Sequence, residues 1–275
     1  MQLEIALHEL NNSIDCGELL FWGKISAEKG DYFLAMAVDY EGKYEFPDKR
    51  FFYAPSKTFK FEQIPDPLDQ HNEFANMSTP FSGDPNLVIK KLEPDEDPEA
   101  AEPAPEGEDG EGEDNLDDTS EDEDAIKVPP KNFTELNRLA FTVRAIENDC
   151  QLVPQGSIKL TPHHEVRRNE AFKGLNLDNC FELSSYIHFR SAQSEEKRDL
   201  NEQDDAIFRP DFLENLESDP IKGSWSIQTD TMWTQTVVKS LLWPGFVGYH
   251  KLNSKQYGAV YLGNGIKNAD LPFML

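Results

Sequence analysis

The sequence has few of the features that direct a chain to a membrane or out of the cell. It holds only three cysteines, Cys16, Cys150 and Cys180, which lie far apart and form no CxxC pair. Such a sparse, odd set is typical of a reducing compartment. No apolar run reaches the roughly 18 residues of a membrane span, and the first residues lack the pattern of a signal peptide. These absences predict a cytosolic or cytoskeletal protein.

The sequence also lacks the motifs of common enzyme classes. It contains no phosphate-binding P-loop and no G-x-S-x-G nucleophile motif. Gly263-Asn264-Gly265 begins like a dinucleotide loop, but no third glycine and no helix pattern follow, which indicates a turn between strands. His163 and His164 are adjacent, and neighbours on a strand point to opposite faces, so they suit one metal ion poorly. We therefore expect no catalysis, no cofactor and no metal.

Basic residues are missing from one long stretch. From Glu93 to Asp124 there are 18 acidic residues, one leucine, no aromatic residue and no Lys or Arg. This stretch explains most of the formal net charge of −26, because the rest of the chain has 34 acids against 26 bases. Such a segment cannot bury a core, which predicts a disordered acidic insert at residues 93–125. The acidity also argues against nucleic-acid and anionic-membrane partners, which attract basic surfaces.

Aromatic residues, by contrast, are plentiful on both sides of the insert. The chain has 18 Phe, 8 Tyr and 4 Trp, and aromatic residues favour strands and interfaces. A length of 275 residues suits one large domain or two small ones. We expect residues 1–92 and 126–275 to form together one α+β, β-rich domain of antiparallel sheets with a few short helices.

The predicted strands are apolar runs separated by turn residues. Leu19 to Ile25 and Asp31 to Tyr40 flank the Lys29-Gly30 turn and predict a β-hairpin. Residues 152–158 indicate a strand, a turn and a strand, and residues 65–85 a loop. Further strands are predicted at residues 50–53, 58–64, 225–228, 236–242, 246–252 and 259–262.

Helix signals are fewer. They predict a short N-terminal helix over residues 3–10, a helix over 178–187 with Asp178 as its N-cap, and a short helix over 211–216. His188 would then lie at a helix end, where a cation suits the dipole. Residues 136–146 fit a helix or a helix followed by a strand, and residues 194–205 fit a helix or a loop.

Several sequence blocks, in one order on both sides of the insert, resemble a known family. They are Leu20-Phe21-Trp22-Gly23-Lys24-Ile25, residues 31–35, 172–175, 183–190, 223–228, 240–245 and 257–263, and the final Lys267 to Leu275. Together they resemble the radial spoke head proteins of motile cilia and flagella, in particular the radial spoke head protein 9 family. The insert is longer and more acidic than the family pattern, so its role is not carried over.

The resemblance implies a structural subunit of the axonemal radial spoke head that relays contact between the central apparatus and the dynein arms. The implied partners are other radial spoke head proteins, of the 4/6 type and the MORN-repeat type, and the projections of the central apparatus. The implied location is the axoneme of a cilium or flagellum, after synthesis in the cytoplasm. Composition alone leaves one alternative, a soluble acidic chaperone or cation-binding module that acts through residues 93–124.

The C-terminal block suggests where partners bind. Core burial accounts for most aromatic residues, but Trp and Tyr also dominate interface hot spots. Leu271 to Leu275 is unusually apolar for a chain end, and it either closes the core of this subunit or docks on a neighbour. The candidate interface residues are Trp22, Trp225, Trp243, Tyr249, Tyr257, Pro272, Phe273 and Leu275.

Overall fold

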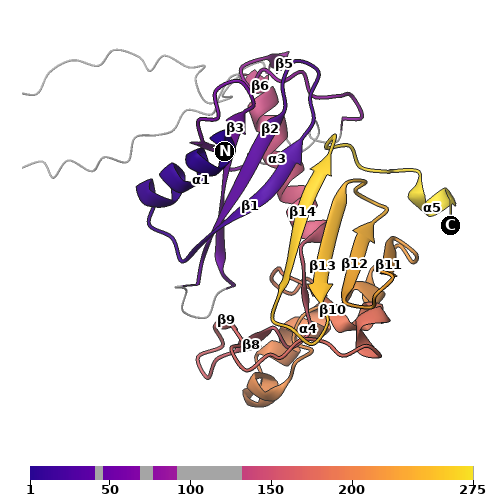
Figure 1. Ribbon diagram of the computed structural model, residues 1–275. Helices are drawn as coiled ribbons and strands as arrows, with labels where there is room; N and C mark the ends of the chain where they lie inside the picture. The colour runs from indigo at the N-terminus through magenta and orange to yellow at the C-terminus, as the bar shows by residue number, and fades with distance from the viewer. Residues whose placement is uncertain (41–45, 69–76, 92–131, 275) are drawn as a thin grey trace, which may run out of the picture.

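The computed structural model of the chain describes residues 1–40, 46–68, 77–91 and 132–274 (Figure 1). The acidic insert predicted at residues 93–125 lies outside the described residues, and so does Leu275. A large mixed sheet and a few helices make up the described part, which confirms the predicted α+β, β-rich class.

One eight-stranded sheet takes strands from both ends of the chain, in the order β11-β12-β13-β14-β1-β2-β3-β4. Neighbours pair antiparallel except β1 and β14, which pair parallel. This parallel pair, here called the seam, joins an N-terminal half, β1–β4, to a C-terminal half, β11–β14. The strands are β1 Glu18–Ile25, β2 Tyr32–Asp39, β3 Asp48–Pro55, β4 Glu62–Gln63, β11 Trp225–Thr229, β12 Gln235–Ser240, β13 Phe246–Lys251 and β14 Tyr257–Gly263.

Gly23 makes the seam possible. Its φ is 150°, and a Cβ at this position would lie 2.1 Å from the carbonyl oxygen of Tyr261. The register of β1 against β2 shifts between Phe21 and Gly23, which marks a β-bulge. The bulge leaves Trp22 and Ile25 buried in the main core. The glycine of the Phe21-Trp22-Gly23-Lys24 block is thus required by the close approach of two strands.

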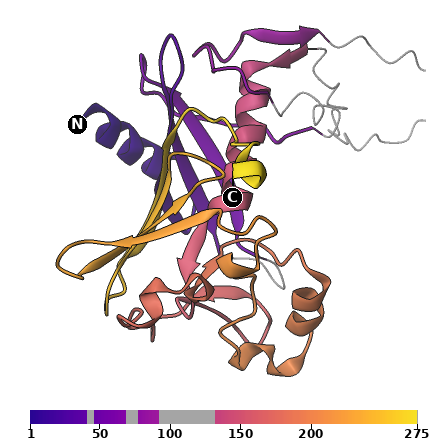
Figure 2. The ribbon, with the colours of Figure 1, turned by 90° about the vertical axis from the view of Figure 1, so that its right-hand side faces the viewer.

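Two helices pack on opposite faces of the sheet (Figure 2). α1, Gln2–Ser13, covers what we call the outer face, where Leu10 packs with Ala35, Ala37 and Phe52 of the N-terminal half. α3, Glu135–Cys150, covers the inner face and adds Leu139, Val143 and Ile146 to the main core. The sheet therefore has its principal core on the inner side and a smaller one under α1.

A smaller lobe of short elements lies below the sheet in Figure 1. It is formed by the part of the chain that follows α3 and precedes β11. Its strands pair as β7 with β10 and β8 with β9, while β5 pairs with β6 at the other end of the molecule. The remaining elements are β5 Val88–Lys91, β6 Asn132–Thr134, β7 Leu152–Pro154, β8 Ile158–Leu160, β9 Val166–Arg168, β10 Tyr186–His188, α4 Glu195–Asn201, α5 Leu271–Met274 and the 3-10 helices η2 Asn179–Phe181, η3 Leu183–Ser185, η4 Asp204–Phe208 and η5 Leu216–Ser218.

The structure confirms most of the predicted elements. The N-terminal helix, the β1–β2 hairpin and all four C-terminal strands form where the sequence predicts them. Residues 136–146 are helical throughout, as part of α3, and residues 195–201 form α4. These elements have a clear apolar pattern bounded by turn or capping residues.

Four predictions were wrong, at least in part. Residues 178–187 form two 3-10 helices and then β10, because pairing with β7 holds residues 186–188 extended. His188 accordingly lies in a strand and not at a helix end. Residues 211–215 form no helix, since Phe212 and Leu213 both turn into the core, and Leu216 only begins the 3-10 helix η5. Of residues 58–64 only Glu62–Gln63 is strand, because Phe59 has φ 52° and stacks on Phe33.

Candidate interaction surface

The histidines and cysteines of the described part do not gather into a group that could bind a metal ion. Within residues 1–40, 46–68, 77–91 and 132–274, no group of three or more His, Cys, Asp or Glu side chains could hold a metal ion. His164 lies in the turn between β8 and β9, with its Nδ1 2.7 Å from the carbonyl oxygen of Asn201. Burial raises the pKa of the Cys150 thiol, which therefore stays protonated at neutral pH. No helix of the described part is long and apolar enough to cross a bilayer.

Three of the predicted interface residues are buried tryptophans. Trp22, Trp225 and Trp243 are 5%, 8% and 4% exposed. Each indole N–H donates a hydrogen bond of 2.7–2.9 Å to one carboxylate: Trp22 to Glu147, Trp225 to Asp219 and Trp243 to Asp149. A hydrogen bond to a charged group contributes about 1.5–3 kcal/mol to stability. These three indoles hold the fold together. The exposed residues among the predicted set are the ones at which the interface prediction can be tested.

The carboxylate of Glu147 joins three elements. It accepts from Trp22 of β1 and, at 2.6 Å, from the Lys49 ammonium of β3, while Glu147 itself belongs to α3. Burial lowers the pKa of Lys49, and the ion pair with Glu147 opposes that shift. The Lys49 ammonium also donates to the carbonyl oxygen of Phe189, so this buried charge has two partners. A buried ion pair of this kind ties the inner face of the sheet to α3.

A second cluster surrounds Asp219. His188 Nε2 lies 2.8 Å from Asp219 Oδ1, and the Trp225 indole donates to Asp219 Oδ2. Burial alone would raise the pKa of Asp219, but its contacts with His188 and Trp225 lower it overall. The carboxylate is therefore ionised at neutral pH and fixes the edge strand β11 to the smaller lobe.

The two predicted tyrosines differ in position. Tyr257 is half-buried, with its ring 6.3 Å from that of Phe172 and 6.0 Å from the Arg168 guanidinium carbon. Tyr249 points to the outer face and is 42% exposed. Its ring lies against Gly258, where a Cβ would come within 3.0 Å of it. Tyr249 thus offers an aromatic surface that no described residue covers fully.

The sequence left open whether the C-terminal segment closes the core or docks on a neighbour, and in the structure it is partly buried and partly exposed. Leu271 is 4% exposed and packs into the molecule, whereas Phe273 and Met274 are 88% and 73% exposed. Pro272 is exposed as well, and it lines a groove of about 630 Å³. Other apolar residues that line this groove include Phe141, Ala145, Leu242, Trp243 and Ile266. Exposed apolar side chains beside an apolar groove are typical of a protein–protein contact.

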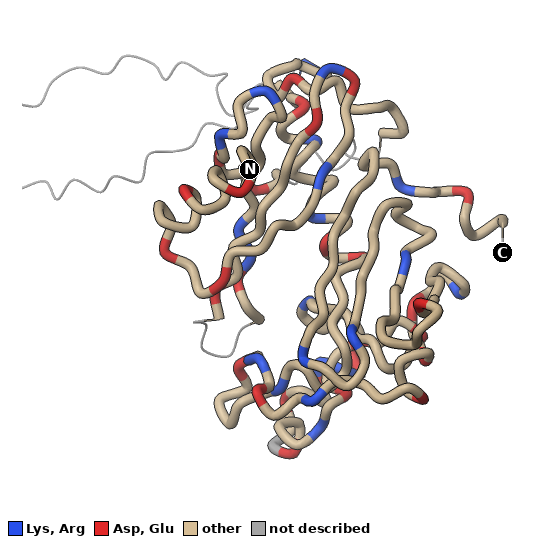
Figure 3. Tube along the Cα trace, in the orientation of Figure 1, with Lys and Arg blue, Asp and Glu red and all other residues tan. Residues whose placement is uncertain are grey.

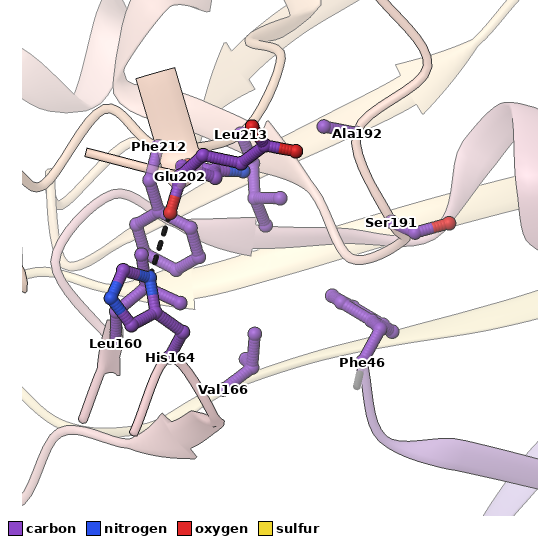
Figure 4. Close-up of a pocket in the computed structure, with 10 residues that line it drawn as sticks. Phe46, Leu160, His164, Val166, Ser191, Ala192, Glu202, Phe212 and Leu213 are labelled. Atoms are coloured by element: carbon purple, nitrogen blue, oxygen red, sulfur yellow. Dashed lines mark hydrogen bonds between the residues drawn. The ribbon is translucent and has the colours of Figure 1, made fainter. Parts of the chain in front are cut away.

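A second cavity, of about 410 Å³, lies in the smaller lobe (Figure 4). Phe46 faces Val166 across it, and Leu160, Phe212 and Leu213 complete the apolar wall. Its polar lining residues are His164, Ser191, Asn201 and Glu202. This composition is typical of packing between a loop and a small lobe, and we assign it no chemical role.

The outer face of the C-terminal half is open in the described part of the chain (Figure 1). Side chains alternate along β12, β13 and β14, so one set lies in the core and the other points outward. We call the outward set the open face; its apolar and charged residues are Val237, Lys239, Val247, Tyr249, Lys251, Val260 and Leu262, and Gln235 and Gly258 lie on it as well. Leu262 is 55% exposed.

Several exposed apolar residues were not predicted from the sequence as candidate contacts. Met232 and Trp233 occupy the turn between β11 and β12 and are 80% and 56% exposed. Trp233 has φ 56° and stacks edge-on against Phe181, with ring centroids 5.5 Å apart. Phe208 is 82% exposed in the smaller lobe. A tryptophan in the polar turn Asp230 to Thr234 is the signal that could have identified this site.

Comparison with known proteins gives a consistent result. No protein-family model matches the chain. The chain is 32% identical over 274 residues to the radial spoke head protein 9 homolog of Danio rerio, covering 99% of this chain and 90% of that protein. It is 32% identical over 258 residues to the Homo sapiens homolog, covering 94% and 84%. A Xenopus tropicalis homolog is 36% identical over 140 residues, half of each chain.

Proposed function

Because the chain belongs to the radial spoke head protein 9 family, we propose that it is a structural subunit of the axonemal radial spoke head in motile cilia and flagella. The observation that carries this proposal is the similarity to the Danio rerio homolog over 99% of the chain. In this role the subunit relays contact between the central apparatus and the dynein arms, and so controls beating. It does so without catalysing a reaction.

The buried polar contacts between the sheet and α3 support a mechanical role. Tyr32 donates a 2.6 Å hydrogen bond to Glu135 at the start of α3, and the Lys49–Glu147 pair lies further along the helix. Removing one partner of a buried ion pair typically costs about 3–5 kcal/mol, because the other charge is left desolvated. α3 and the sheet therefore resist shifting against each other. A subunit that relays mechanical contact from one partner to another requires such rigidity.

We also propose that residues 1–92 and 126–275 act as one domain on either side of the insert. The seam pairs Gly23 with Tyr261, and the Trp22 indole donates to Glu147. Both contacts cross from the first segment to the second. They support a single unit that moves as one body inside an assembly.

The proposed partners are the 4/6-type and MORN-repeat subunits of the spoke head, with central apparatus projections as further partners. Tyr249, Pro272 and Phe273 are the predicted interface residues whose side chains are exposed. They would supply aromatic and apolar anchors of the kind that dominate interface energetics. Leu275 stays a predicted contact outside the described residues.

The function is tested by removing the chain from ciliated cells. We expect spokes with incomplete heads in electron tomograms and an abnormal beat in high-speed video, both restored by the wild-type chain. Complete heads and a normal beat without the chain would contradict the proposal.

The C-terminal contact is tested by the change Phe273→Ser. We expect the folded variant to shift from the axonemal to the soluble fraction, because Phe273 is 88% exposed and its loss leaves the core intact. The matched control is Phe208→Ser, which removes an equally exposed phenylalanine, 82%, from the smaller lobe. Equal retention of both variants in the axoneme would exclude Phe273 as an anchor.

A further inference from the structure

The two halves of the sheet present one continuous outer face, but α1 covers only one half of it (Figures 1 and 2). On the N-terminal half, Leu10 of α1 packs against Ala35, Ala37 and Phe52. On the C-terminal half, the open face keeps Tyr249 and Leu262 42% and 55% exposed. The same sheet therefore carries a helix on one side of the seam and none, in the described part, on the other.

The charge of the C-terminal half is unlike that of the rest of the molecule. The chain contains 52 acidic residues, yet β11–β14 contain no Asp or Glu, and these strands are tan and blue without red in Figure 3. Lys239 and Lys251 point outward at the margins of the open face. Neither forms an ion pair within the described residues, although Lys239 donates to the side chain of Gln228.

We propose that the open face binds an amphipathic α-helix of a neighbouring subunit, with an apolar stripe flanked by Asp and Glu. The apolar stripe would cover Val237, Val247, Tyr249, Val260 and Leu262, and the flanking carboxylates would meet Lys239 and Lys251. The inference rests on the proposed function in one respect, since the proposed function names the assembly in which the neighbouring subunit is found. It specifies the surface and the chemistry of the partner.

The dimensions of the open face suit one short helix. The open face lies within the half-sheet β11–β14, whose four strands at a spacing of about 4.8 Å are about 19 Å wide. The helix α1 has 12 residues, which at a rise of about 1.5 Å per residue is about 18 Å long. Gly258 leaves space for the Tyr249 ring to lie along the sheet, which makes the centre of the face smooth and apolar. A helix of the size of α1 would therefore cross the whole half-sheet.

α1 also provides the chemical precedent within this chain. It packs Ala6 and Leu10 toward the sheet and carries Glu4 and Glu9 away from the core. On the N-terminal half it needs small residues beneath it, Ala35 and Ala37. The open face has large apolar residues and lysines instead, so a partner helix there would be recognised by side-chain contact and charge.

The first experiment places the photo-crosslinking residue benzoylphenylalanine at position 249 of the full chain, in cells that lack the endogenous protein. After irradiation of isolated axonemes, mass spectrometry identifies the cross-linked peptide. We expect a peptide from another polypeptide with apolar residues at helical spacing and flanking Asp or Glu. Benzoylphenylalanine at position 208 is the matched control and should give no such product.

The second experiment reverses the charges with Lys239→Glu and Lys251→Glu together. We expect about a tenfold loss of the chain from the axonemal fraction, because like charges then face each other across the interface. The matched control reverses two exposed lysines on the N-terminal half, Lys57→Glu and Lys60→Glu, and should be retained. Circular dichroism and thermal melting check that both variants fold.

The outcomes separate this inference from the proposed function. If the wild-type chain is absent from the axoneme, the proposed function fails. If the chain is present but position 249 cross-links to nothing, to a second copy of this chain, to its own residues or to a segment without acidic residues, this inference alone is overturned. Equal retention of the two charge-reversed variants would overturn it as well.

Discussion

The two halves of the sheet share one inner core but differ on the outer face. The N-terminal half has small residues there, Ala35 and Ala37, and these admit α1 at close range. The C-terminal half has Tyr249 and Leu262, which stay exposed. Alternating residues thus create an outward face in both halves, and within the described residues α1 covers only that of the N-terminal half.

The largest expected effect comes from breaking the connection between the halves. Gly23→Ala would place a Cβ 2.1 Å from the carbonyl oxygen of Tyr261, on a residue whose φ of 150° disfavours any side chain. We expect a loss of more than about 4 kcal/mol in the free energy of unfolding, or no folded protein at all. Urea denaturation followed by tryptophan fluorescence measures it.

Gly30→Ala is the matched control for the seam. A Cβ at Gly30 would meet only side-chain atoms, with Ser56 Oγ at 3.1 Å and Lys57 Cε at 3.6 Å. We expect a change below about 1 kcal/mol. If the two alanine variants have equal stability, the seam does not depend on glycine.

A smaller effect distinguishes the covered face from the open one. Leu10→Ala removes a buried side chain beneath α1 and should cost about 2–3 kcal/mol. Tyr249→Ala removes a ring that is 42% exposed and should cost less than about 1 kcal/mol in the isolated protein. The same denaturation experiment compares them. A Tyr249 variant as unstable as the Leu10 variant would mean that the open face is already packed within the subunit.

The smallest expected effect is a change in how stability depends on pH, and it comes from a histidine on the inner side of β13. His250 neighbours Tyr249 but points into the core, where its Nε2 accepts a 3.0 Å hydrogen bond from the Leu175 N–H. Burial lowers the pKa of His250 below the ordinary histidine value of 6.5. As the pH falls, His250 therefore takes up a proton in the unfolded chain before it does so in the folded one. The contribution of His250 to the free energy of unfolding is complete above pH 6.5 and is lost as the pH falls from there toward the folded-state pKa.

The variant His250→Gln tests this linkage. As the pH falls below about 6.5, we expect this histidine to lower the stability of the wild-type protein by no more than about 1.4 kcal/mol per pH unit. The variant should lack this contribution to the pH dependence. Denaturation curves at a series of pH values measure it. Parallel pH profiles for both proteins would show that His250 does not contribute.

Sequence patterns predicted the elements whose information is local. The β1–β2 hairpin and the four C-terminal strands have alternating apolar residues and turn residues at their ends, and they form as expected. Residues 178–187 were mispredicted because the strand β10 exists only through its pairing with the distant β7. Local spacing contains no information about such a pairing.

The candidate site was less predictable than the fold, for the same reason. The Trp22 indole and the Glu147 carboxylate that accepts its hydrogen bond are 125 positions apart, so the sequence does not reveal that this tryptophan is internal. The exposure of Phe273 beside a buried Leu271 likewise depends on how the last residues meet the groove. Residue type predicted which side chains could bind a partner, and the tertiary structure decides which of them are free to do so.

The seam also sets an order of events during synthesis. Gly23 pairs with Tyr261, so the edge of β1 stays unpaired until nearly the whole chain has left the ribosome. At about 5–20 residues per second, that delay is on the order of tens of seconds. An open strand edge is a template for aggregation, so newly made chains should need protection by chaperones until β14 emerges. β14, the last strand that the structure describes, is thus the one that joins the two halves of the sheet.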